Sequence, residues 1–363
     1  MNFNKKLGFG CMRLPMKDGE VDLQEFSKMI DIFMESGFNY FDTAHGYIQG
    51  KSELAIKECL AKRYNREDYV LVDKLSGGFF KTEQDIDGYF QTMLENTGVE
   101  YFDILLLHTQ TRKNYGHFKE CGAYEKAFEY KAKGLAKMVG ISFHDSPEFL
   151  DKILTENPRI EIVQIQFNYL DTDNPSVESM GCYQVCLKHN KPVIIMEPVK
   201  GGRLQNIPDK AKEVFKSLGN MSPASYAIRY AAGFDNVKMV LSGMSNTQQM
   251  IDNLSFMKDF KPLNDKELQA VMKVKKIINE TEQIPCTACR YCVDGCPQRI
   301  NIPDVFKAFN IMRNGEDGLP FYKKAIENAG KASDCIKCGK CESECPQFID
   351  IRKFLKDAKE IFE

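Results

Sequence analysis

The sequence lacks an excess of charge of either sign, because Lys and Arg number 49 and Asp and Glu number 51. Nucleic acids and anionic membranes are usually bound by a basic surface, so we expect neither partner. Long apolar runs are also missing: the longest, such as 103–107 and 193–196, fall far short of the ~20 residues of a bilayer span. The opening residues, MNFNKKLGFG, do not contain the apolar stretch of a signal peptide. These absences predict a cytoplasmic protein.

No GxGxxG motif follows a predicted strand, which argues against a dinucleotide-binding open sheet. Instead, short β-rich runs alternate with amphipathic helical stretches over most of the first 260 residues. The predicted strands are eight in number and lie at residues 7–12, 40–41, 69–75, 103–107, 138–141, 162–166, 193–196 and 237–241. A helical pattern follows each strand, as is typical of a closed (β/α)8 barrel, or TIM barrel. An open doubly wound sheet remains the alternative.

The thirteen cysteines divide the chain into two parts. Five are scattered over the first 285 residues, and eight lie between Cys286 and Cys345. Clustered cysteines in a cytoplasmic chain are more often metal ligands than disulfides. We therefore predict a barrel over residues 1–281 and a small cysteine-rich domain over residues 282–363.

Polar residues end three successive predicted strands, at Asp42, Lys74 and His108, and Tyr47 lies in the loop after Asp42. The carboxyl ends of barrel strands form the active-site mouth, so we expect these side chains to meet there. Tyr47 could donate the proton that a carbonyl reduction needs, with Lys74 lowering its pKa and Asp42 keeping the lysine charged. A neutral His108 could donate a hydrogen bond to the substrate oxygen. Any one of them alone could be structural, but four together indicate a site.

These residues resemble the catalytic set of the aldo-keto reductase family. The segment Phe41–Tyr47, FDTAHGY, is similar to that family's DTAxxY signature, and further similarity lies in 140–142, 164–168 and 198–204. The resemblance implies an oxidoreductase that uses NADH or NADPH to reduce a carbonyl, or to oxidise an alcohol, of a small molecule. In this hypothesis Tyr47 is the general acid and base.

The resemblance also implies the cofactor contacts. It assigns the nicotinamide carboxamide to Ser142 and Gln164 and the adenine to Asn253, and it puts Met196 where the family often stacks a tyrosine. Further cofactor contacts are expected from Ser242, and from Gly202 and Arg203, where the backbone could approach a pyrophosphate. Arg203 could equally be a solvated side chain.

Three positions depart from the family pattern at the cofactor. Gly243 and Gln249 stand where the family has cationic contacts to a 2′-phosphate, so NADH is as credible a cofactor as NADPH. His144 follows Ser142 and Phe143 where an asparagine is usual, and it could face the cofactor, the substrate or solvent. Three other histidines, His45, His117 and His189, have no convergent partners in the sequence.

The eight clustered cysteines form two runs of identical spacing, CxxCxxCxxxCP, over residues 286–297 and 335–346. This doubled spacing is typical of two [4Fe–4S] clusters in which the fourth cysteine of each run ligates the other cluster. The predicted ligands are Cys286, Cys289, Cys292 and Cys345 for the first cluster, and Cys335, Cys338, Cys341 and Cys296 for the second. Two zinc sites are the alternative, although zinc ligands usually form two separated pairs.

The two cysteine runs are joined by 38 residues that include a helical stripe at 305–312 and a predicted helix at 319–328. Because a compact ferredoxin has a shorter connection, the tail resembles the α-helical ferredoxin modules of heterodisulfide reductase and fumarate reductase relatives. A hydride carries two electrons together, whereas a cluster moves one at a time. Three hypotheses follow: the clusters relay electrons to an external electron carrier, they are purely structural, or the barrel is a scaffold for an electron-transfer protein.

Overall fold

The computed structural model describes residues 3–281 and 283–363. The chain forms two compact units, of which the first comprises Met1–Pro198 with Ser225–Asn264 and the second Val199–Ala224 with Asp265–Glu363. The boundary that we predict between residues 281 and 282 stays a prediction. The two units are defined by packing, and each contains segments that are separated in the sequence. Over the two described ranges, none of the helices has the length and apolar character needed to cross a membrane.

The first unit contains a closed barrel of eight parallel strands, in the order β1, β10, β9, β8, β7, β6, β5, β4. The strands are β1 (Leu7–Gly10), β4 (Tyr40–Asp42), β5 (Val70–Leu75), β6 (Phe102–Gln110), β7 (Ala136–Phe143), β8 (Ile162–Gln166), β9 (Val193–Met196) and β10 (Val237–Ser242). Every predicted strand is present, so the barrel prediction is confirmed and the open sheet is excluded. A short hairpin of β2 (Met16–Lys17) and β3 (Glu20–Val21) follows β1.

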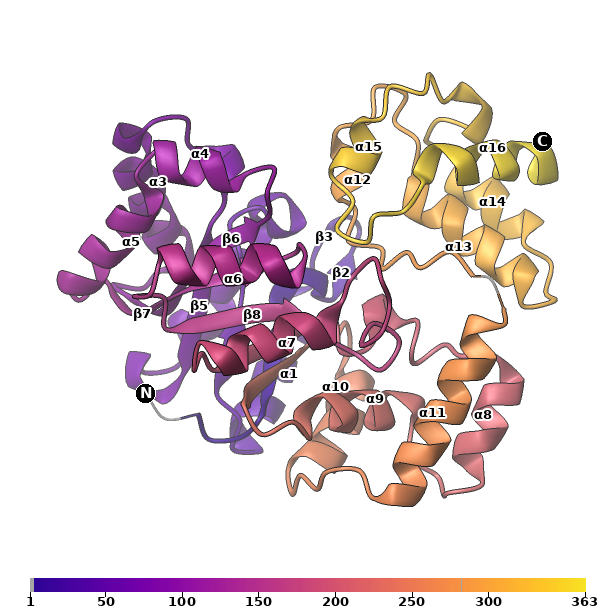
Figure 1. The fold of residues 1–363 in the computed structure, drawn as a ribbon, viewed down its shortest axis with the longest axis horizontal. Coiled ribbons are helices and arrows are strands. Elements are labelled where there is room, and N and C mark those ends of the chain that lie inside the picture. Colours follow the sequence, from indigo (N-terminus) through magenta and orange to yellow (C-terminus); the bar gives the residue numbers. More distant parts are fainter. Residues whose placement is uncertain (1–2, 282) are drawn as a thin grey trace. The chain divides into compact units, whose positions relative to one another are not determined.

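Helices surround this barrel, and Figure 1 shows α6 and α7 on either side of β8. They are α1 (Leu23–Glu35), α2 (Lys51–Ile56), α3 (Glu83–Thr97), α4 (Tyr115–Glu120), α5 (Ala123–Ala132), α6 (Pro147–Glu156), α7 (Ser179–Lys188), α10 (Thr247–Met257) and all but the first two residues of α9 (Pro223–Ala232). The first illustrates why they form: Asp22 caps α1 by accepting from the Glu25 amide, and an apolar stripe including Phe26 and Phe33 is buried.

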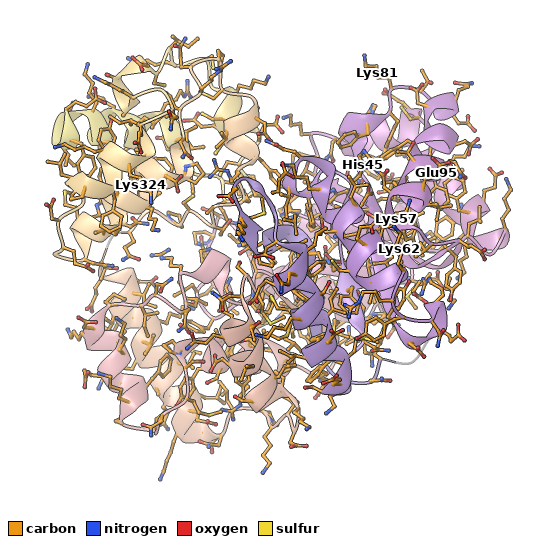
Figure 2. All side chains as sticks on the ribbon, turned by 180° about the vertical axis from the view of Figure 1, so that it is seen from behind. His45, Lys57, Lys62, Lys81, Glu95 and Lys324 are labelled. Atoms are coloured by element: carbon orange, nitrogen blue, oxygen red, sulfur yellow. The ribbon has the colours of Figure 1, made fainter. Side chains whose placement is uncertain are left out.

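Apolar side chains from the strands fill the barrel, among them Val72, Ile104 and Ile194, so its interior is a packed core. Strands β7 and β8 approach closely at Gly140, where a Cβ atom would lie 2.4 Å from the carbonyl oxygen of Ile162. Outside the barrel, Lys57 Nζ donates to the carbonyl oxygen of Glu95 in α3 at 2.8 Å, and Figure 2 labels both residues. The barrel mouth is therefore held by a rigid scaffold.

The second unit is helical and has its own buried core. Its helices are α8 (Asp209–Lys216), α11 (Asp265–Asn279), α12 (Tyr291–Asp294), α13 (Ile302–Arg313), α14 (Leu319–Ala325), α15 (Lys340–Ser343) and α16 (Ile351–Phe362). The two helices predicted between the cysteine runs are present as α13 and α14, although α14 ends three residues early, in a turn. Helices α13, α14 and α16 lie together, and the short helices α12 and α15 contact each other (Figure 1).

Candidate functional site

A buried ion pair lies at the carboxyl ends of β4 and β5. Lys74 Nζ is 2.6 Å from Asp42 Oδ1 and also donates to the carbonyl oxygen of Thr43 at 2.6 Å. Gln164 Nε2, from β8, donates to the other Asp42 oxygen at 3.0 Å. Asp42 and Lys74 are 3% and 0% exposed, and charges buried to this extent need such partners. The lysine is thereby held in one orientation.

Tyr47 is placed against this pair at the start of the single-turn segment η2 (Tyr47–Gly50). Its ring centroid is 4.9 Å from Lys74 Nζ and 6.0 Å from the His108 ring centroid. The next two residues, Ile48 and Gln49, have φ angles of 52° and 56°, in the left-handed region that non-glycine residues avoid. Such strain is characteristic of functional sites, where the surroundings hold it. All four predicted catalytic residues thus lie together.

The pKa of Tyr47 departs from our expectation. Desolvation of its hydroxyl raises this pKa well above 10, and the neighbouring Asp42 carboxylate raises it further. We expected the Lys74 ammonium to lower the pKa, and the direction is the opposite. The physical reason is that Asp42 balances the lysine charge at 2.6 Å, whereas nothing of comparable size offsets the desolvation.

His108 has the neutral form that we expect. Burial lowers its pKa well below 6.5, and the charge of Lys74 and the neighbouring His144 lower it further. The Nδ1 atom of His108 is 2.6 Å from Ser76 Oγ, which leaves Nε2 as the ring nitrogen available to a ligand. Burial also lowers the pKa of His144, to about 4, so this histidine is neutral as well.

The predicted cofactor contacts of the barrel form two buried groups. Ser142 and Gln164 are register partners on β7 and β8, and Ser142 Oγ accepts from the Thr109 amide at 2.7 Å. Asn253 Nδ2, from α10, donates to Ser242 Oγ at the end of β10 at 2.8 Å. Each of these side chains already has a hydrogen-bond partner within the barrel, which fixes its position.

The remaining predicted cofactor residues fall in different units. Met196 ends β9 in the first unit. Gly202 and Arg203 belong to the second unit, where Arg203 Nε donates to Gln283 Oε1 at 3.2 Å. Arg203 therefore has a hydrogen-bond partner in its own unit, whereas the alternative was a side chain that contacts only solvent.

Arg13 is a candidate that the sequence analysis missed. A Cβ atom at Gly243 would lie 3.8 Å from an Arg13 guanidinium nitrogen, so this cation adjoins the segment expected to bind a 2′-phosphate. Arg13 Nη2 is also 3.4 Å from Glu197 Oε1. Gln249 Oε1 accepts from the Ser245 amide at 2.8 Å and shapes the same segment. No local sequence pattern connects Arg13 to a segment some 230 residues away.

A second polar cluster lies behind Lys74, and it also corrects the expectation that His45 has no partner. His45 Nδ1 (labelled in Figure 2) is 2.8 Å from Glu53 Oε2, which also accepts from Asn96 Nδ2 at 2.9 Å. Asp73 is the second buried carboxyl group of this cluster and interacts with Glu53, so we infer that the two share one proton. Burial, the largest cause for both, raises the pKa of Glu53 to about 7 and that of Asp73 well above 3.8.

The other two histidines also have partners. His189 Nε2 is 2.6 Å from Asp151 Oδ1, and His117 Nε2 is 3.0 Å from the carbonyl oxygens of Gly77 and Phe80. Both pairs lie within the first unit and have structural roles, because they join neighbouring loops and helices.

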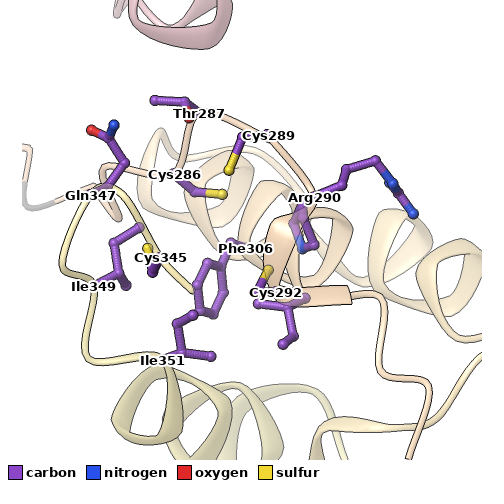
Figure 3. Close-up of a pocket in the computed structure, with 12 residues that line it drawn as sticks. Cys286, Thr287, Cys289, Arg290, Cys292, Phe306, Cys345, Gln347, Ile349 and Ile351 are labelled. Atoms are coloured by element: carbon purple, nitrogen blue, oxygen red, sulfur yellow. The ribbon is translucent and has the colours of Figure 1, made fainter. Parts of the chain in front are cut away.

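The eight clustered cysteines line two cavities in the second unit. Cys286, Cys289, Cys292 and Cys345 line the first, shown in Figure 3, and Cys296, Cys335, Cys338 and Cys341 line the second. Among the residues that the structure describes, no three His, Cys, Asp or Glu side chains converge closely enough to hold a single metal ion. A tetrahedral zinc would require all four sulfurs within about 2.3 Å of one point. Thiols spread around a cavity fit a larger inorganic cluster better.

The two cysteine runs also fold alike, 49 residues apart in the sequence. Non-glycine residues with a positive φ angle recur at equivalent positions of the two runs: Ala288 is equivalent to Lys337, and Arg299 to Phe348. The short helices α12 and α15 are related by the same interval, as are the starts of α13 and α16. The fold of the second unit is therefore a tandem repeat built around the cysteines.

Comparison with known proteins identifies both parts. A closed barrel with these four side chains at its mouth is the architecture of a class of oxidoreductases. A model of the Aldo/keto reductase family matches residues 6–276, and the chain belongs to that family. A 4Fe-4S dicluster domain matches residues 285–349. The protein is thus an oxidoreductase of the aldo/keto reductase family with an iron–sulfur domain, as the sequence predicts.

Curated relatives resemble only parts of the chain closely. Norsolorinic acid reductase B of Aspergillus parasiticus is 40% identical over 78 residues, which are 20% of this chain and 20% of that protein. An uncharacterized oxidoreductase of Bacillus subtilis is 23% identical over 303 residues, 75% of this chain and 92% of that protein. The match to the first of these thus spans about a fifth of its length.

Solved structures match the barrel over most of their own length. An aldo-keto reductase of Bacillus halodurans in its holo form is 25% identical with a TM-score of 0.61, over 74% of this chain and 91% of that chain. An aldo-keto reductase of Klebsiella pneumoniae in complex with NADPH is 17% identical with a TM-score of 0.60, over 74% and 90%. The second likeness shows the fold alone.

The shared proton of Glu53 and Asp73 generates a prediction about stability. Because the pKa of Glu53 is raised from 4.5 to about 7, the stability that its proton contributes is fully present below pH 4.5 and is lost as the pH rises through about 7. We therefore expect the free energy of unfolding to fall between about pH 5 and about pH 8, and to fall less in Glu53→Gln. Anaerobic urea unfolding of the holoprotein measures it.

The matched control is Glu58→Gln, since Glu58 pairs with Lys62 on the exposed surface at 2.6 Å. This control should keep the wild-type pH dependence. Equal pH dependence in wild type and Glu53→Gln would contradict the shared proton.

Proposed function

We propose that the barrel reduces the carbonyl of a small molecule, or oxidises the corresponding alcohol, with NADH or NADPH, and that Tyr47 is the general acid and base. The observation that carries this proposal is the position of the Tyr47 ring beside both the Lys74 ammonium and the neutral His108 ring. A bound nicotinamide cofactor would supply or accept the hydride.

The four side chains divide the work between them. Tyr47 donates its proton to the oxygen that becomes an alkoxide. His108 is assigned to hold that oxygen through Nε2, in the tautomer whose Nδ1 accepts from Ser76 Oγ at 2.6 Å and whose ring proton is on Nε2. The Lys74 ammonium, held by Asp42, packs against the Tyr47 ring at 4.9 Å and fixes the position of the phenol.

Cofactor binding is assigned to polar groups of the barrel and, by the family resemblance, to two residues of the second unit. We propose Ser142 and Gln164 for the carboxamide, Met196 for packing on the nicotinamide, and Ser242 with Asn253 for the adenosine half. Gly202 and Arg203 are proposed for the pyrophosphate, on the strength of the family resemblance. The buried side chains of Ser142, bonded to the Thr109 amide, and of Asn253, bonded to Ser242, support this set, because a preorganised site binds with less loss of entropy.

For the second unit, we propose that the two cavities hold [4Fe–4S] clusters with exchanged fourth ligands, and that the clusters relay electrons to an external carrier. The grouping of thiols supports the exchange: Cys345 lines the cavity of the first run and Cys296 that of the second. Burial, and next the thiols of Cys289, Cys286 and Cys345, raise the pKa of Cys292, which iron ligation would offset. The relay is favoured over purely structural clusters by the exposed Cys338.

We expect Tyr47→Phe to lower carbonyl reduction by about 10²–10⁴-fold and to leave cofactor binding nearly intact. The phenol supplies a proton and little of the cofactor affinity. Steady-state oxidation of NADPH with a panel of aldehydes and ketones gives the rate, and quenching of nicotinamide fluorescence gives the affinity. Tyr101→Phe, which alters a distant tyrosine that accepts from Lys137, is the control. Retained reduction in Tyr47→Phe would refute the acid–base role.

NADH and NADPH are expected to bind within about tenfold of each other, a difference of at most ~1.4 kcal/mol. Gly243 and Gln249 offer no cation, and the Arg13 guanidinium is paired with Glu197. Titration of both cofactors against one preparation tests this, with Arg13→Met measured in parallel. A strong NADPH preference in the wild type would contradict this prediction. If the preference disappears in Arg13→Met, Arg13 binds the 2′-phosphate despite its ion pair with Glu197.

Anaerobically purified protein should carry about eight irons and about eight acid-labile sulfides per chain, from two cubane clusters. The exchange of ligands predicts that the double variant Cys292→Ala/Cys345→Ala loses one cluster and keeps about four irons, because both residues serve the first cavity. Without the exchange, this variant would damage both clusters. Cys121→Ala, in the barrel, should leave the iron content unchanged, and zinc without sulfide would exclude the clusters.

A further inference from the structure

One short segment of the second unit reaches the first cysteine run from elsewhere in the chain. It is η6 (Lys200–Gly202), which begins four residues after Met196 in the sequence. Gly201 has a φ angle of +62°, and a Cβ atom there would lie 2.2 Å from the carbonyl oxygen of Thr287. Only glycine permits this backbone contact with the loop between Cys286 and Cys289.

The residue before this glycine is a buried lysine. Lys200 is 2% exposed, and its Nζ atom donates to Gln347 Oε1 at 3.2 Å. Gln347 follows Cys345 by two residues and is 6% exposed. Both Gln347 and Thr287 line the first cavity, and Figure 3 shows them on the same side of it as Cys286. The Lys200 ammonium therefore lies next to the wall of the first cavity.

A positive charge in this position acts on whatever the four thiols hold. An iron–sulfur cluster with four thiolate ligands has a net negative charge, and its reduction adds one electron with no bond broken. In a low-dielectric surrounding, a fixed cation stabilises the more negative, reduced form. Net charge and hydrogen bonding near the sulfurs are among the factors that set cluster potentials.

We propose that Lys200 raises the reduction potential of the cluster in the first cavity and, through Gln347, positions the loop that presents Cys345. This inference rests on the proposed function, in which that cavity holds a [4Fe–4S] cluster. Lys200 is an electrostatic and positioning residue, because its ammonium donates to Gln347 and it touches no substrate.

Each cavity is also lined by an arginine that has an acidic partner. Arg290 at the first is 3.7 Å from Asp304, and Arg352 at the second is 2.7 Å from Glu342. Cys338 is exposed there, and Ile336 beside it is 58% exposed, so solvent reaches this ligand. The two clusters should therefore have different potentials, and a change at Lys200 should act on one of them.

The test is an anaerobic redox titration of the full-length holoprotein, with dithionite as the electron source and the electron paramagnetic resonance of the reduced clusters as the readout. In Lys200→Met, we expect one midpoint potential to become more negative by about 59 mV. This shift corresponds to about a tenfold change in the equilibrium constant of a one-electron reduction. The other midpoint should not move and serves as the internal reference. Lys200→Arg, which keeps the charge, should titrate close to wild type.

Lys212→Met is the matched control, because Lys212 lies on α8 of the same unit and pairs with Asp209 on the exposed surface. Iron and sulfide are measured on every variant, and Lys200→Gln replaces Lys200→Met if the latter loses iron. If Lys200→Met or Lys200→Gln has its full iron content and unchanged midpoint potentials, the role of Lys200 is wrong. The proposal that the cavities hold clusters would not be affected by that result. Wild-type protein without iron and sulfide would instead overturn the proposed function on which the inference rests.

Discussion

The buried ion pair of Lys74 and Asp42 is the constraint on which the barrel mouth depends. Removing both charges from water costs several kcal/mol per ion, and the mutual attraction repays this only when the remaining hydrogen-bonding capacity is also satisfied. Here the Thr43 carbonyl and the Gln164 amide supply the missing partners, from two further positions around the barrel. An apolar pair of similar volume would avoid this desolvation cost. The charges are therefore better explained by what they do to Tyr47 than by stability.

Much of this arrangement could be predicted from the sequence, for identifiable reasons. Strands of a parallel barrel are buried and apolar, so their positions are visible as short runs between helical patterns. Because their carboxyl ends must meet, polar residues at three successive ends, Asp42, Lys74 and His108, could be grouped without any coordinates. The cysteine spacing likewise carries its own geometry, and the two cavities collect the eight thiols in the predicted sets.

What the sequence did not predict depends on packing between distant segments. Arg13 adjoins Gly243 only because β1 and β10 are neighbours in the closed barrel, and Glu53 meets Asp73 only because α2 packs behind β5. The pKa of Tyr47 was predicted in the wrong direction for a related reason. A sequence shows that a lysine is near, but it does not show how much water the phenol loses or that a carboxylate already balances the lysine.

The surroundings of buried groups also matter in the second unit, where the groups are cysteine thiols. Its two repeats have the same backbone, so differences between the clusters must come from what surrounds them. A cluster that only held the fold together would gain from complete burial, since exposed thiolate ligands are open to oxidation. In the first cavity Cys292 is buried, whereas Cys338 in the second cavity is exposed. The two repeats therefore differ in how far solvent reaches a cysteine, although their backbones match.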